Sequence, residues 1–163
     1  MTTTSSVLAT VVDPQGGLRV ESTTGSGVTL AFDSPGGGGT PPAVEPTESL
    51  LAALAGCTAM DVASILRKKR QGAFGYQIQV SAEKRDQHPR VYTRISVEHQ
   101  VSGEVEPEAL RRAIELSATR YCPVNAMLSG AVVVEHRYRL RRAGLDDVGA
   151  LVAVTGPEGI RVV

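Results

Sequence analysis

An unbroken apolar stretch near the middle of the chain, residues 50–60, limits what this sequence can fold into. It follows Pro46, a residue suited to the first position of a helix, and it precedes the basic residues 67–70, which favour a helix C-terminus. The charges therefore predict one long helix over residues 46–71. Because the first half of this helix is apolar on every face, it has to be covered from all sides, and a partner subunit is one source of that cover.

Shorter patterns on both sides of this helix predict strands, loops and a second helix, which together make an α+β domain over residues 1–141. The expected elements are a β-meander (7–33), a Gly/Pro loop (34–45), the long helix (46–71), a β-hairpin (76–102), a second helix (107–121) and a final strand (131–140). Residues 142–163 form a C-terminal extension, for which a small hairpin is one option.

The composition excludes several classes of protein. The 163 residues carry 17 Lys and Arg against 17 Asp and Glu, so the chain lacks the positive charge expected of a nucleic-acid-binding protein. The N-terminus does not resemble a secretory signal, and the apolar stretch reaches Asp61 well short of the ~18 residues that a membrane span needs. We therefore expect a cytoplasmic protein that binds neither nucleic acid nor membrane.

The two cysteines, Cys57 and Cys122, are the best indicators of function. Cys57 lies in the apolar stretch, and Cys122 ends the second helix, because Pro123 disfavours a helical conformation of the residue before it. In the cytoplasm most disulfides are transient and catalytic, so the pair predicts thiol chemistry, with two inert buried thiols as the alternative. His99 and His136 fall on the apolar faces of their strands and are expected to be core residues, and no Cys or His spacing is typical of a metal site, so we expect no metal.

The sequences around both cysteines resemble those of the OsmC/Ohr superfamily, which contains thiol-dependent peroxidases. The resemblance extends over residues 18–140 and is carried by Pro46-x-Glu48-x-Leu50-Leu51-Ala52-Ala53-Leu54-x-Gly56-Cys57-Thr58 and by Tyr121-Cys122-Pro123-Val124. The stretch 56–71 is similar in particular to the YhfA-like branch. The resemblance implies an intertwined homodimer with antiparallel sheets around the long buried helix.

The same resemblance implies a role for each cysteine. Cys57 would be the peroxidatic thiolate, which attacks an organic hydroperoxide and becomes a sulfenic acid, and Cys122 would resolve it as a disulfide. An external dithiol, for example a lipoylated reductant, would restore both thiols, and no bound cofactor is implied. The alternative is a dimeric small-molecule-binding or redox-sensing protein without efficient turnover.

Three charged residues are further candidates for the site. The superfamily ionises its thiol with an arginine that is held by a glutamate; Arg19 and Glu48 are the matches in this sequence, with an exposed arginine and a helix-dipole role as the other interpretations. At ~100° per residue, Glu48 lies about 180° around the helix from Cys57. Asp61 is one turn after Cys57 and would oppose thiolate formation unless it orients a cation; a structural salt bridge is the alternative.

Overall fold

The chain is described by a computed structural model that combines strands and helices, which confirms the α+β class. The residues that it describes are 4–12, 18–34, 43–72 and 74–163. They fall into two compact units, Met1–Leu50 and Leu51–Val163, and each unit is considered by itself. Most of the Gly/Pro loop expected over residues 34–45 lies outside the described residues.

The first unit contains a three-stranded antiparallel sheet in the order β1-β2-β3. Its strands are β1 (Val7–Val11), β2 (Val20–Thr24) and β3 (Thr29–Phe32). The turn between β2 and β3 contains Gly27 at a φ of 84°, a left-handed conformation that favours glycine. This sheet corresponds to the meander expected from the sequence.

Helix α1 (Pro46–Lys68) begins at the expected proline and carries an acidic residue, Glu48, in its first turn. Arg67 and Lys68 occupy the last turn, where positive charge stabilises the negative end of the helix dipole. The helix ends three residues before the expected position 71, close to Arg70, which has a left-handed φ of 55°.

The exposure of α1 is uneven. Its fully buried residues follow one another at intervals of four, and therefore form a single face: Leu54, Thr58, Val62 and Leu66. Met60 is 73% exposed, so the second unit by itself does not cover the helix on every side. The apolar stretch was expected to be too short for a membrane span, but by length and composition alone α1 as a whole is long and apolar enough for one, as core helices of soluble proteins also are.

The second unit is built on a five-stranded sheet in the order β4-β5-β6-β7-β8. Its strands are β4 (Phe74–Lys84), β5 (Tyr92–Gly103), β6 (Val133–Arg141), β7 (Val148–Gly156) and β8 (Gly159–Val162). Neighbouring strands are antiparallel except β5 and β6, which are parallel. Residues 142–163, expected as an extension, supply two strands of this sheet, and Val152, Ala153 and Thr155 of β7 are buried.

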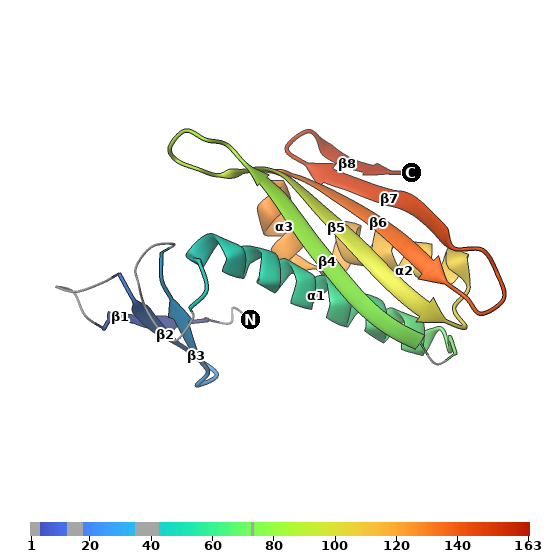
Figure 1. Ribbon diagram of the computed structural model, residues 1–163, viewed down its shortest axis with the longest axis horizontal. Helices are drawn as coiled ribbons and strands as arrows, with labels where there is room; N and C mark the ends of the chain where they lie inside the picture. The colour runs from blue at the N-terminus through green and yellow to red at the C-terminus, as the bar shows by residue number, and fades with distance from the viewer. Residues whose placement is uncertain (1–3, 13–17, 35–42, 73) are drawn as a thin grey trace. The chain divides into compact units, whose positions relative to one another are not determined.

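A parallel strand pair requires a crossover connection, which is provided by the helices between β5 and β6. They are α2 (Pro107–Leu116), the π-helical turn η1 (Ser117–Tyr121) and α3 (Pro123–Ser129). Figure 1 shows α1, α2 and α3 on the same face of the sheet. Buried residues at alternate positions of β5 and β6 form the sheet side of the core: Ile95, Val97, His99, Val101, Val134, His136, Tyr138 and Leu140.

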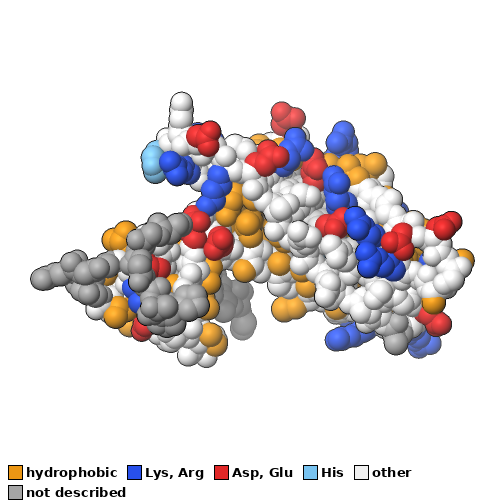
Figure 2. Space-filling model, in the orientation of Figure 1, with side chains coloured by type: hydrophobic (Ala, Val, Ile, Leu, Met, Phe, Trp, Pro, Cys, Tyr) orange, Lys and Arg blue, Asp and Glu red, His pale blue; other side chains and the backbone are white. Residues whose placement is uncertain are grey.

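The other face of this sheet is polar. Figure 2 shows Lys and Arg side chains intermixed with Asp and Glu side chains over the strands of the second unit. Arg94 pairs with Glu135 across β5 and β6, and Arg139 lies 3.5 Å from Glu98. Acidic and basic side chains of neighbouring strands therefore pair with one another on this face.

Candidate functional site

Three candidate residues from the sequence come together in the second unit. Cys57 and Asp61 lie one turn apart on α1, and Cys122 lies between η1 and α3. Their two sulfurs and a carboxylate oxygen are all within 4.8 Å of one another. Both thiols are free; Cys122 is buried and Cys57 is half-buried. Sulfur and carboxylate oxygen are also donor types that Zn²⁺ accepts, so this cluster combines redox and metal-binding potential.

The position of Cys122 follows from the backbone around it. Its N–H donates to the carbonyl of Ser117 at 3.0 Å, the wider hydrogen bond that closes the π-helical turn. Cys122 then takes an extended conformation, with φ −73° and ψ 105°, because Pro123 disfavours the helical region for the residue before it. The helix end expected at Cys122 is therefore present, and a further helix, α3, starts at Pro123.

Cys122 Sγ accepts hydrogen bonds from two different helices. The hydroxyl of Thr58 on α1 donates to it at 3.6 Å, and the backbone N–H of Asn125 on α3 donates to it at 3.3 Å. The Cys57 thiol is a third hydrogen-bond partner of Cys122. Thr58 and Asn125 are themselves buried. The surroundings of this sulfur are therefore rich in donors.

The surroundings of Cys57 have the opposite character. Burial raises the pKa of the Cys57 thiol to about 11, and the hydrogen bond to Cys122 and the electrostatic effects of Cys122 and Asp61 act in the same direction. A hydrogen bond with the Val124 backbone lowers the pKa but does not compensate for these effects. Since the thiolate is the nucleophile, the second unit by itself holds Cys57 as an unreactive thiol at neutral pH.

Asp61 links the thiols to a neighbouring cavity. Its carboxylate accepts a hydrogen bond from the hydroxyl of Ser117 at 3.0 Å. Burial and, to a smaller extent, the charge of Asp61 raise the pKa of Tyr76. Asp61 also borders a cavity of about 500 Å³, whose other lining residues include Ile65, Leu116 and Tyr121. Asp61 is thus in contact with both the buried site and a space that a small molecule can enter.

The side chain of Asn125 anchors α3 to the sheet. Its Nδ2 donates to the carbonyl of Ala118 at 2.7 Å and to the hydroxyl of Thr155 at 3.2 Å, and its Oδ1 lies 3.0 Å from Nε2 of His136. Because Nδ2 is the donor in the first two bonds, Oδ1 has to accept from His136, which fixes the proton of that histidine on Nε2. The partners Ala118, His136 and Thr155 belong to η1, β6 and β7, so the side chain of Asn125 connects α3 to these three elements.

A second buried histidine lies beside His136. The ring centroids of His99 and His136 are 5.9 Å apart, and the hydroxyl of Tyr76 lies 2.7 Å from Nδ1 of His99. Burial lowers the pKa of His136 to about 4, and burial together with the neighbouring His136 lowers the pKa of His99 well below its ordinary value. Both rings are therefore neutral near pH 7. They are core residues, as the alternation in their strands predicted.

Arg19 and Glu48 belong to the first unit, whereas both thiols belong to the second. Arg19 directly precedes β2 and lies 3.7 Å from Glu21. The carboxylate of Glu48 accepts a hydrogen bond from the N–H of Glu45 at 3.3 Å, which fits a residue that stabilises the start of a helix. Because the two units are considered separately, a role of Arg19 or Glu48 at Cys57 stays a prediction.

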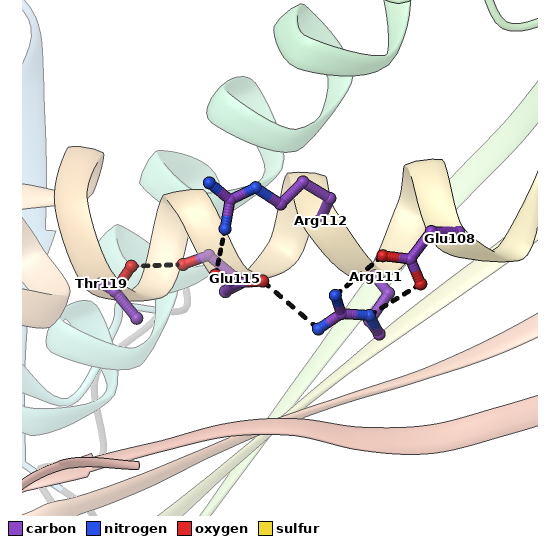
Figure 3. Close-up of polar contacts among 5 residues, drawn as sticks. All are labelled: Glu108, Arg111, Arg112, Glu115 and Thr119. Atoms are coloured by element: carbon purple, nitrogen blue, oxygen red, sulfur yellow. Dashed lines mark hydrogen bonds and ion pairs between the residues drawn. The ribbon is translucent and has the colours of Figure 1, made fainter. Parts of the chain in front are cut away.

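The charged residues of α2 form a network of their own. Figure 3 shows Arg111 between Glu108 and Glu115, at 2.7 and 3.3 Å, with Arg112 also paired to Glu115. Thr119 donates to the carbonyl of Glu115 at 2.8 Å. All these contacts join residues three or four positions apart, so they stabilise the helix itself.

Sequence analysis missed three residues that contact the thiols or Asp61, namely Thr58, Ser117 and Asn125. Thr58 carried a signal, because it has the only hydroxyl group in the apolar stretch 50–60. Asn125 carried a weaker one, since it is the third residue after a cysteine that ends a helix. The partners of its side chain come from distant strands and have no counterpart in the local sequence.

Comparison with known proteins places the chain in a family. The model of the OsmC-like protein family matches residues 36–137. Protein YhfA of Escherichia coli (strain K12) is 36% identical over 125 residues, which cover 76% of this chain and 91% of that protein.

Solved structures show the same fold. A hypothetical protein from Aquifex aeolicus VF5 is 26% identical, with a TM-score of 0.74 over 86% of this chain and 98% of that one. The organic hydroperoxide resistance protein OhrB of Bacillus subtilis is 19% identical, with a TM-score of 0.55 over 86% of this chain and 98% of that one. The site, the family model and the similarity to YhfA agree with the resemblance found in the sequence, and the chain belongs to the OsmC-like protein family.

Proposed function

We propose that this protein is a thiol-dependent peroxidase that reduces organic hydroperoxides through Cys57 and Cys122. One observation carries the proposal: two cysteines that are remote in the sequence have their sulfurs within 4.8 Å of each other. A disulfide has an S–S bond of about 2.05 Å, so the two sulfurs have to move closer together for the bond to form. The name of OhrB, an organic hydroperoxide resistance protein with the same fold, supports the choice of substrate.

The reaction takes place in three steps. Cys57 Sγ attacks the O–O bond, so that the thiol and the hydroperoxide become a sulfenic acid and an alcohol. Cys122 Sγ then attacks the sulfenic sulfur; the S–S bond forms, the S–O bond breaks, and the hydroxyl group leaves as water with the proton of the Cys122 thiol. An external dithiol reduces the disulfide by two exchange reactions and is itself oxidised to a disulfide. No bound cofactor takes part.

The lining of the site favours an apolar substrate. Cys57 is surrounded in α1 by leucine, alanine and methionine, and the cavity beside Asp61 offers the apolar surfaces of Ile65, Leu116 and Tyr121 next to the polar residues Asp61, Ser64, Lys68 and Lys69. An alkyl or aryl hydroperoxide buries its apolar part against such residues, whereas hydrogen peroxide gains nothing from them. We therefore expect organic hydroperoxides to react faster than hydrogen peroxide.

Assembly and activation are part of the proposal. A second copy of the chain would cover the exposed apolar side of α1, where Met60 is 73% exposed. Cys57 needs a cation or donor that lowers its pKa from about 11, and Arg19 held by a glutamate is the candidate from the sequence. We expect the homodimer to act in the cytoplasm, where dithiol reductants are available.

The test is a reaction of the reduced protein with a stoichiometric amount of cumene hydroperoxide, followed by peptide mapping in the mass spectrometer. We expect a Cys57–Cys122 disulfide in the unchanged chain. Cys122→Ser stops at the Cys57 sulfenic acid, which dimedone traps, and Cys57→Ser leaves Cys122 reduced. Two unmodified thiols after complete exposure to the hydroperoxide contradict the proposal.

The raised pKa of Cys57 also favours a second candidate function, a dimeric small-molecule-binding or redox-sensing protein without efficient turnover. In such a protein the thiol need not ionise readily, and the cavity beside Asp61 would hold the ligand. Catalytic and sensing roles differ in the number of turnovers. A sensor is oxidised once and consumes no further hydroperoxide in the presence of excess dithiol, whereas a peroxidase continues until the hydroperoxide is exhausted.

A further inference from the structure

Thr58 is a buried polar residue whose position relates it to both thiols. It follows Cys57 in α1, and its hydroxyl donates to Cys122 Sγ at 3.6 Å. It is fully buried, and its neighbours on the same face of the helix, Leu54 and Val62, are apolar. Valine has nearly the same shape and would fill this place without the cost of burying a hydroxyl group. The hydroxyl is therefore the feature of Thr58 that packing does not explain.

We propose that Thr58, together with the backbone N–H of Asn125, holds and activates Cys122 Sγ for its attack on Cys57, so that Thr58 belongs to the catalytic site. The disulfide-forming step of the function proposed above depends on this contact. The two donors reach the sulfur from α1 and from α3, and therefore fix its direction from both helices. They also stabilise the negative charge on the attacking sulfur.

The donor on α3 is itself held rigidly. The side chain of Asn125 is bonded to Ala118, Thr155 and His136, so its backbone N–H cannot move away from Cys122 without breaking buried hydrogen bonds. Thr58 is the adjustable partner, because a threonine hydroxyl turns freely about its C–O bond. Its hydrogen can therefore stay directed at Cys122 Sγ as the sulfur approaches Cys57, while the oxygen keeps its place.

The attack of Cys122 on the Cys57 sulfur can be measured without a peroxide by using dithiobis(nitrobenzoate), an aromatic disulfide. Cys57 attacks the reagent, forms a mixed disulfide and releases one coloured thiolate. Cys122 then attacks the Cys57 sulfur of the mixed disulfide, the Cys57–Cys122 bond forms, and a second coloured thiolate leaves. Stopped-flow absorbance resolves the two releases, and Cys122→Ser identifies the first one because it abolishes the second.

We expect Thr58→Val to slow the second release by about ten- to a hundredfold, the effect of losing one hydrogen bond to a charged group. The first release is expected to keep its rate. Thr58→Ser, which retains a hydroxyl group, is the matched control and is expected to behave like the unchanged chain. A second release of unchanged rate in Thr58→Val, or one slowed equally in Thr58→Ser, overturns the proposal.

Thr58→Ala also removes the hydroxyl, and its side chain is smaller than that of valine. It replaces Thr58→Val if the valine variant does not fold. A parallel reaction with cumene hydroperoxide distinguishes this inference from the peroxidase function. If Thr58→Val accumulates a Cys57 sulfenic acid that dimedone traps, the peroxidase function and the role of Thr58 are both supported. If no variant reacts with the hydroperoxide but the second aromatic release still depends on Thr58, the peroxidase function fails and the role of Thr58 stands.

Discussion

At the scale of single residues, the two sulfurs are neighbours with opposite surroundings. Burial and the charge of Asp61 keep Cys57 protonated, with a pKa of about 11, whereas Cys122 accepts hydrogen bonds from Thr58 and Asn125. Only the thiolate reacts, so the ionisation of Cys57 limits the first chemical step. Below its pKa, each unit of pH raises the fraction of thiolate about tenfold.

Asp61→Asn is therefore expected to make Cys57 more reactive. The substitution removes a negative charge that raises the pKa of Cys57, so at a given pH below that pKa more of the thiol is ionised. We expect alkylation of Cys57 by iodoacetamide to become about two- to fivefold faster, the size typical of a modest charge effect. Peptide mass spectrometry at successive times gives the rate for Cys57 alone.

Asp61→Glu retains the charge and is the control for this substitution. Its rate is expected to stay near that of the unchanged chain. If the Cys57 thiol of Asp61→Asn reacts more slowly, Asp61 assists the ionisation of Cys57, for example by orienting a cation, and does not oppose it.

At the scale of elements, α3 owes its position to Asn125. Asn125→Ala would leave Nε2 of His136 and the carbonyl of Ala118 without the partner that now satisfies them. Buried polar groups that lose their partners are costly, so we expect the free energy of unfolding to fall by about 2–4 kcal/mol. Urea denaturation followed by circular dichroism measures the change.

Met127→Ala, a substitution at an exposed position of the same helix, controls for the effect of altering α3. It is expected to change stability by less than about 0.5 kcal/mol. If Asn125→Ala is as mild as this control, the three hydrogen bonds of Asn125 do not hold α3 to the sheet.

Elements with local signals were predictable from the sequence, and elements that depend on distant contacts were not. Pro46 predicted the start of α1, and the Cys122–Pro123 pair predicted the bend that ends η1. The π-helical turn and α3 were not foreseen, because the partners of Asn125 lie on β6 and β7. Likewise, the approach of Cys122 to Cys57 was expected only from the family resemblance, since no spacing in the chain specifies it.

At the scale of the whole molecule, the two buried histidines make stability depend on pH. Both have pKa values lowered by burial, so the unfolded chain binds more protons than the folded one below about pH 6.5. Their contribution is complete above pH 6.5 and is lost as the pH falls towards the folded-state pKa, about 4 for His136. We expect a loss of about 3 kcal/mol from His136 by pH 4.

Urea denaturation at several pH values between 6.5 and 5, above the range in which most carboxylates titrate, measures the first part of this loss, about 2 kcal/mol from His136. A flat profile over this interval would mean that the folded protein takes up protons at His99 and His136 as readily as the unfolded chain.

The exposed side of α1 predicts a second property of the whole molecule, its assembly. A helix of this apolar character with Met60 73% exposed is expected to bury that side against a second copy of the chain. Met60→Glu would place a carboxylate in the contact without a partner, which weakens association by several kcal/mol. Sedimentation velocity is expected to show a dimer for the unchanged chain and a monomer for the variant. Gln77→Glu, which adds the same charge at an exposed position of β4, should remain dimeric; a dimer that survives Met60→Glu would place the subunit contact elsewhere.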